Sequence, residues 1–202
     1  EVFEFAPSVK EQYEALNGLQ EIYVNDLTRP DVYLTLEKEL GMGDSDNQRR
    51  DSLTFAAAQR QFDLGNHERS LEAFANYLEK YEDGQYEMLA RYNQGRSALI
   101  LENYDIALEA FANLCDLNSA RFPDACAKGA KIAYHYAQDF ELAQNLFLKS
   151  EKVSQSQEEQ EAAIIGILQS AFRTQNDSLI YTYSQKVLSI EKLSDADRVF
   201  AH

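Results

Sequence analysis

Apolar side chains recur three and four residues apart along most of the chain, which is the spacing of a helix that buries one face. No alternating run of β-branched residues bounded by turn dipeptides occurs, so no strand is expected. Each of the three prolines stands just ahead of an apolar-periodic run, where proline suits the first helical turn. The pattern therefore predicts an all-α protein. The expected helices are Ser8–Val24, Pro30–Leu40, Asp51–Leu64, His67–Lys80, Gln85–Leu101, Tyr104–Leu117, Pro123–Ala137, Phe140–Val153, Gln157–Thr174 and Ser178–Ile190.

The chain also repeats itself. Residues 64–74 align with residues 101–111 and with residues 138–147, and Phe74, Phe111 and Phe147 are then 37 and 36 residues apart. A weaker copy follows near residues 176–188, and a degenerate one precedes the others at residues 8–40. A period in this range is typical of a helical solenoid, in which each helix pair packs on the next.

The copies at residues 101–111 and 138–147 place an alanine between two aromatic residues on a single helical stripe. Tyr104, Ala107 and Phe111 are an example: the alanine lets two helices approach, and Phe111 fills the space between neighbouring copies. Glycine inside a helix costs about 1 kcal/mol relative to alanine, so we expect close backbone packing at glycines within first helices. These glycines are Gly18, Gly95, Gly129 and Gly166.

Several segments carry a resemblance to a known family. They are residues 74–81 (FANYLEKY), Tyr86, residues 90–95 (ARYNQG) and residues 103–107 (NYDIA). Over residues 8–190 the chain resembles the tetratricopeptide repeat family, and within it bacterial envelope members of the Tol-Pal coordinator and outer-membrane assembly lipoprotein types. The resemblance implies an all-α, right-handed superhelical solenoid of about five helix pairs, with residues 1–202 forming a single solenoid.

Two polar segments interrupt this plan. Residues 41–50 are polar and contain two glycines, so we expect a long loop inside one solenoid; the alternative is a linker between two domains. Residues 194–202 combine an N-cap serine, first-turn acids and an apolar stripe, which predicts the start of a further helix. An uncapped solenoid end indicates a piece of a longer array, and the alternative is a C-terminal capping helix.

In the tetratricopeptide family the first helix of each pair lines a concave groove that holds an extended peptide or a partner's helix. Helical spacing places a matching set of residues on that face, and in the three central first helices five basic residues oppose four acidic ones, within a chain of net charge -15. We expect a groove suited to a peptide with apolar anchors and an acidic group; the alternative is that the aromatics serve only repeat packing. The groove residues are Phe55, Gln59, Phe62, Tyr92, Arg96, Leu99, Lys128, Ile132, His135, Ile165, Gln169 and Arg173.

One subfamily does not fit. Co-chaperones of this family grip a terminal carboxylate with lysine, asparagine and arginine at set positions of three first helices. The matching positions here hold Phe55, Gln59, Asn93, Ala125 and Gly129, of which only Asn93 agrees.

Composition and motifs exclude several other functions. A net charge of -15 would repel a phosphate backbone, so no nucleic acid is expected, and no apolar run is long enough for a membrane span. The three histidines are far apart and lack the spacing of helical metal sites, and no phosphate loop or nucleophile elbow occurs. We therefore expect no metal, no cofactor, no small-molecule substrate and no enzymatic activity.

The two cysteines fall on either side of a predicted turn. Cys115 and Cys126 are either buried free thiols, the interpretation we favour from the sequence, or a disulfide, which needs α-carbons within about 7 Å and an oxidising compartment. The resemblance favours the bacterial periplasm or cell envelope over the cytoplasm.

These observations predict a non-enzymatic protein-interaction scaffold that belongs to a longer bacterial envelope protein. The alternative is a regulatory or recruiting tetratricopeptide domain of a multidomain enzyme or transcriptional regulator. A third possibility, carbohydrate binding on tyrosine and phenylalanine platforms, suffers from the absence of tryptophan.

Overall fold

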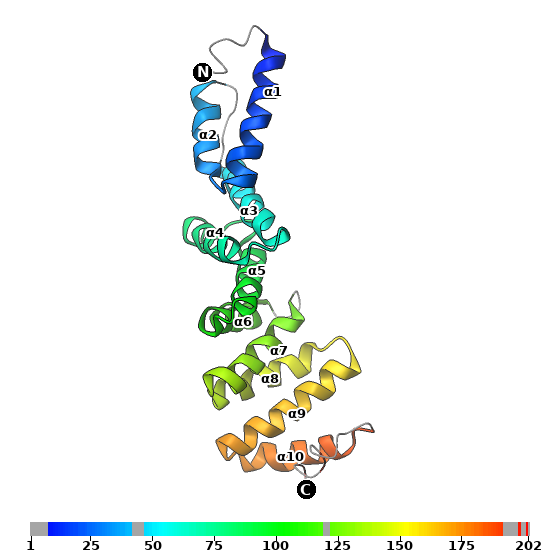
Figure 1. The fold of residues 1–202 in the computed structure, drawn as a ribbon. Coiled ribbons are helices and arrows are strands. Elements are labelled where there is room, and N and C mark those ends of the chain that lie inside the picture. Colours follow the sequence, from blue (N-terminus) through cyan, green and yellow to red (C-terminus); the bar gives the residue numbers. More distant parts are fainter. Residues whose placement is uncertain (1–7, 42–46, 119–121, 192–197, 199–200, 202) are drawn as a thin grey trace. The chain divides into compact units, whose positions relative to one another are not determined.

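The computed structural model describes residues 8–41, 47–118, 122–191, 198 and 201, and within these ranges every regular element is helical. The all-α prediction is thus confirmed. The chain divides into two compact units, residues 1–101 and residues 102–202 (Figure 1). The first contains α1 (Val9–Gln20), η1 (Glu21–Asp26), α2 (Pro30–Glu39), α3 (Asn47–Asp63), α4 (His67–Lys80) and α5 (Glu87–Ile100). The second contains α6 (Tyr104–Asn118), α7 (Pro123–Ile132), η2 (Ala133–Ala137), α8 (Phe140–Val153), α9 (Gln157–Thr174) and α10 (Asp177–Leu188).

Two of the predicted first helices end in a π-helical turn, η1 after α1 and η2 after α7. Within each unit, helices that follow one another in the chain pack side by side: α3, α4 and α5 in the first, and α6 to α10 in the second (Figure 1). Contact is therefore mostly local in sequence, as a repeat protein requires.

The turns between the paired helices repeat at the level of the backbone. Each contains one residue in the left-handed region, with φ between 53° and 75°. The spacings between these residues are 37, 37, 36 and 37 positions, which matches the sequence period and extends it to the two weaker copies. The five residues are Thr28, Gly65, Glu102, Gln138 and Gln175.

The first unit is built around aromatic residues and small ones. Phe74 and Tyr77 of α4 are fully buried against Phe55 of α3, and Ala90 of α5 lies in the same cluster. A second cluster, which includes Tyr33 and Leu34 of α2, joins the first helix pair to α3.

The second unit has one larger core. Leu146 and Phe147 of α8 pack with Ile167 and Leu168 of α9, and the predicted close approaches at two glycines are found here. A Cβ on Gly166 would lie 2.6 Å from the Phe147 ring, and one on Gly129 would lie 3.2 Å from Leu146 Cδ1. The same prediction is wrong for Gly18, because a Cβ there would meet nothing within 4 Å on the exposed side of α1.

The loop predicted over residues 41–50 is wrong at its end, because Asn47–Arg50 form the first turn of α3; residues 42–46 lie outside the described residues. Arg49 Nη2 donates to Glu37 Oε1 of α2 at 2.5 Å, and Glu37 is only 3% exposed. This partly buried ion pair ties the first turn of α3 to α2.

The interpretation of the cysteines as free thiols is also wrong. Cys115 of α6 and Cys126 of α7 form a disulfide, with their α-carbons 4.9 Å apart, and both are buried in the core of the second unit. The helices meet more closely at this turn than the sequence alone indicates.

Most of the predicted further helix, residues 194–202, lies outside the described residues. Arg198 and Ala201 are described and are helical, and Ala201 is buried in the cluster that contains Val187 and Ile190.

Candidate protein-interaction surface

Six of the predicted groove residues lie on two neighbouring helices of the first unit. Helices α3 and α5 contact each other, and a hydrogen bond joins them: Asn93 Nδ2 donates to Gln59 Oε1 at 2.7 Å. Gln59 Nε2 in turn donates to Asp63 Oδ1 at 2.8 Å, so the amide is fixed at both ends. We call this face the α3–α5 surface; its residues are Phe55, Gln59, Phe62, Tyr92, Arg96 and Leu99.

Arg96 is the exposed cation of the α3–α5 surface. Its guanidinium carbon lies 4.6 Å from the centre of the Phe62 ring and 5.8 Å from that of Tyr92. Stacking on two rings holds the guanidinium in place without neutralising its charge. The guanidinium N–H groups of Arg96 remain able to donate hydrogen bonds to a carboxylate.

The α3–α5 surface also borders a hollow of about 370 Å³, which Phe55 and Gln59 line and Arg96 does not. Phe55 and Tyr86 stack there with ring centres 4.5 Å apart, and Gln59, Arg60 and Asp63 line it as well. Phe55 is 8% exposed, so most of its ring serves the core of the unit. The hollow therefore offers an aromatic edge with one charge of each sign next to it.

A buried hydrogen-bond network positions Tyr86. Tyr77 Oη donates to Asp51 Oδ1, and the other oxygen of this carboxylate accepts from the Gln85 amide at 2.7 Å. The Tyr86 amide donates to Tyr77 Oη at 3.1 Å. Burial, and next to it the hydrogen bond to Asp51, raise the pKa of Tyr77 well above its ordinary value of 10.0. The phenol therefore stays protonated and keeps the turn before α5 in place.

The predicted groove residues of the second unit are placed less uniformly. Lys128 is half-buried and forms an ion pair with Asp124 one turn earlier, whereas Ile132 is only 2% exposed and is not available to a partner. His135 is exposed, with its ring edge-on to Tyr134 at 5.0 Å. Of these residues, Lys128 and His135 are the ones a partner could reach.

On α9, Ile165 and Gln169 are half-buried and Arg173 is exposed. The Arg173 guanidinium lies 4.1 Å from the centre of the Phe140 ring, which repeats the arrangement of Arg96 on Phe62. Both units thus present an arginine of a predicted first helix stacked on a phenylalanine; Phe62 belongs to the first helix α3, whereas Phe140 begins the second helix α8.

The sequence missed some residues of these surfaces. The sequence assigns Tyr86 no place in the groove, although its spacing of four residues from Ala90 places it over the core face. Tyr104 and Tyr136 stack with ring centres 3.6 Å apart, and hydrogen bonding to Tyr136 raises the pKa of Tyr104 to about 12. Tyr104 and Tyr136 are distant in sequence, and no local sequence pattern predicts that their rings stack.

In the described part of the chain, no helix combines the length and apolar character that crossing a membrane requires. Comparison with protein-family models, with curated proteins and with solved structures finds no match to this chain.

Proposed function

We propose that this chain is a non-enzymatic protein-interaction scaffold of the tetratricopeptide type. In this proposal its helix pairs form a right-handed superhelix, and the first helix of each pair faces a partner peptide or helix. The ligand for the α3–α5 surface is a segment with an apolar anchor and a carboxylate.

The observation that carries the proposal is Arg96 stacked on Phe62 and Tyr92, on the same α3–α5 surface whose Phe55 and Gln59 line a hollow. Tryptophan, tyrosine and arginine dominate the energetics of protein interfaces. An exposed arginine already held by rings loses little side-chain entropy when it binds a carboxylate.

The disulfide supports the proposed location in the bacterial cell envelope. Disulfides persist in the periplasm and outside the cell and are rare in reducing cytosol, so Cys115–Cys126 favours an envelope scaffold over a cytosolic regulatory domain.

The test is affinity capture of partners from the source organism with three forms of the protein: unchanged, Arg96→Glu, and Lys38→Glu as a matched control. Lys38 is an exposed cation of α2 outside the α3–α5 surface, so its reversal changes net charge equally. We expect Arg96→Glu to lose a partner that Lys38→Glu retains.

A captured partner is then mixed in purified form with each variant, and circular dichroism checks that helicity is unchanged. Equal affinity for all three forms would refute the assignment of the α3–α5 surface.

A further inference from the structure

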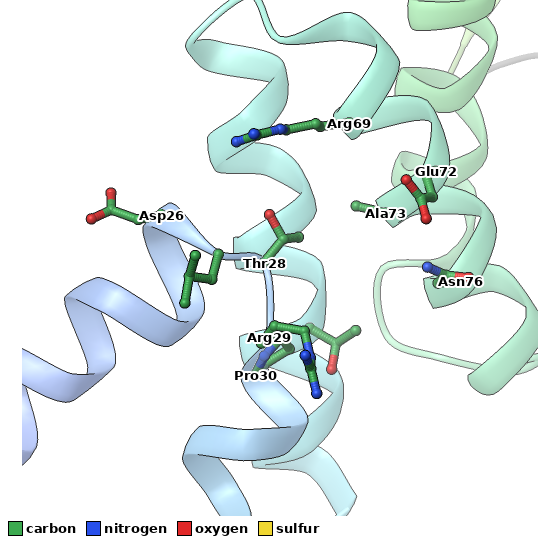
Figure 2. A pocket seen from close by; sticks show the side chains of 10 residues that line it. Asp26, Thr28, Arg29, Pro30, Arg69, Glu72, Ala73 and Asn76 are labelled. Atoms are coloured by element: carbon green, nitrogen blue, oxygen red, sulfur yellow. The ribbon is translucent and has the colours of Figure 1, made fainter.

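A second hollow in the first unit lies on other residues. It measures about 360 Å³ and is bounded by the turn between η1 and α2, by α3 and by α4 (Figure 2). This volume falls at the lower end of the range of small-molecule sites. The hollow shares no lining residue with the one on the α3–α5 surface. Its lining residues are Asp26, Leu27, Thr28, Arg29, Pro30, Thr54, Arg69, Glu72, Ala73 and Asn76.

One side of this hollow is a single stripe of α4. Arg69, Glu72, Ala73 and Asn76 are spaced three, four and seven residues from the first, so their side chains share one helix face. Ala73 is buried and supplies an apolar base between the polar groups. In Figure 2 the Ala73 side chain points toward Thr28, and Arg69 extends from α4 above Thr28.

The polar side chains of this α4 stripe have no partner among the described residues. Within the described ranges, the side chains of Arg69, Glu72 and Asn76 form no hydrogen bond or ion pair, and all three are exposed. Across the hollow, Arg29 forms an ion pair with Asp31 at 3.5 Å, and Asp26 is exposed. Side chains of both charges therefore line the hollow, although in Figure 2 the Asp26 side chain points away from α4.

The turn opposite α4 is strained. Thr28 has a φ of 55°, a left-handed conformation that a β-branched residue rarely adopts. It directly follows η1, a π-helical segment, and π-helical turns are frequent at functional sites. Leu27, the residue before Thr28, is 55% exposed and lines the hollow.

The charged residues that line the hollow indicate which charges its ligand carries. The lining contains two acidic residues, Asp26 and Glu72, and two basic ones, Arg29 and Arg69, so it favours neither a lone anion nor a lone cation. A ligand that carries both charges satisfies both pairs.

We propose that this hollow binds a zwitterion of amino-acid or short-peptide chemistry. Arg69 donates to the carboxylate of the ligand, Glu72 accepts from its ammonium group, and a small apolar side chain lies on Ala73 and Leu27. The sequence predicts no small-molecule substrate, and this ligand is bound and not converted.

The test uses amide NMR spectra of the full chain with four probes: L-alanine, trialanine, N-acetyl-trialanine and trialanine amide. We expect the Thr28, Ala73 and Asn76 amides to shift with L-alanine or trialanine, and the tighter of the two identifies a free amino acid or a peptide as the ligand. Capping either end removes one charge and should weaken binding about tenfold or more. Equal binding of capped and uncapped trialanine, or no shift at about 10 mM of L-alanine and trialanine, would overturn the proposal.

Variants separate the site from nonspecific contact. Arg69→Gln and Glu72→Gln should each lose binding about tenfold, whereas Lys80→Gln, an exposed cation of the same helix outside the hollow, should leave it unchanged. Equal loss in all three variants would contradict the assignment. Because the Arg96→Glu test acts on other residues, this proposal and the scaffold proposal fail independently.

Discussion

Breaking the Cys115–Cys126 disulfide should destabilise the second unit by an amount that depends on the length of the loop that the bond closes. The two residues are 11 positions apart, and loop-closure entropy for a link of that length amounts to about 3 kcal/mol at 25 °C. Both sulfur atoms are buried, so reduction removes the link while leaving the same atoms in the core. The loss should therefore come mainly from the greater freedom of the unfolded chain.

The measurement is urea unfolding of oxidised and fully reduced protein, followed by circular dichroism. With a slope of about 1–3 kcal/mol per molar urea for a small domain, the midpoint should fall by about 1–3 M. A Cys115→Ala, Cys126→Ala variant controls for the reductant, because its midpoint should not respond to it.

Two results would refute this reasoning. One is a midpoint that stays constant on reduction. The other is two titratable thiols in oxidised protein unfolded without reductant, which would mean that the bond does not form.

Two further predictions concern packing and pH. Gly166→Ala forces a Cβ against the Phe147 ring and should lower the free energy of unfolding by about 1–3 kcal/mol, whereas Gly18→Ala, where space is open, should raise it by up to about 1 kcal/mol. Thermal melts check both, and equal effects would contradict the packing described. Tyr77→Phe should lower stability at pH 7 by about 1–3 kcal/mol because it leaves Asp51 without one of its donors. The raised pKa of Tyr77 means that its contribution is present below pH 10.0 and is lost as pH rises beyond that value, so the variant should show a shallower alkaline decline in urea titrations. A decline as steep as that of the unchanged protein would show that Tyr77 does not titrate as described.

The repeat and its helices could be predicted from the sequence because both are local. Apolar spacing fixed most helix boundaries to within a few residues, and the aligned copies located the turns. Asn47–Arg50 were missed because a polar first turn has no apolar stripe, and what holds it in place is the pairing of Arg49 with Glu37 of another helix.

The arrangement of the candidate surface was predictable only in part. Helical spacing brought Gln59 and Arg96 to one face, but it could not tell that Ile132 lies in the core or that Asn93 serves to link two helices. Which side of a helix is covered depends on its neighbours. The pairing of Cys115 with Cys126 depends likewise on how closely two helices meet.

The left-handed turn residues have a further consequence for engineering. Gln138 is followed by Asp139, whose side chain accepts from the Leu142 amide, and Gln175 is followed by Asn176, whose side chain accepts from the Leu179 amide. The two junctions are interchangeable in backbone geometry and in capping chemistry. Deleting residues 139–175 would join Gln138 directly to Asn176 and form the same type of turn. These positions are therefore suitable junctions for shortening or lengthening the protein by one helix pair.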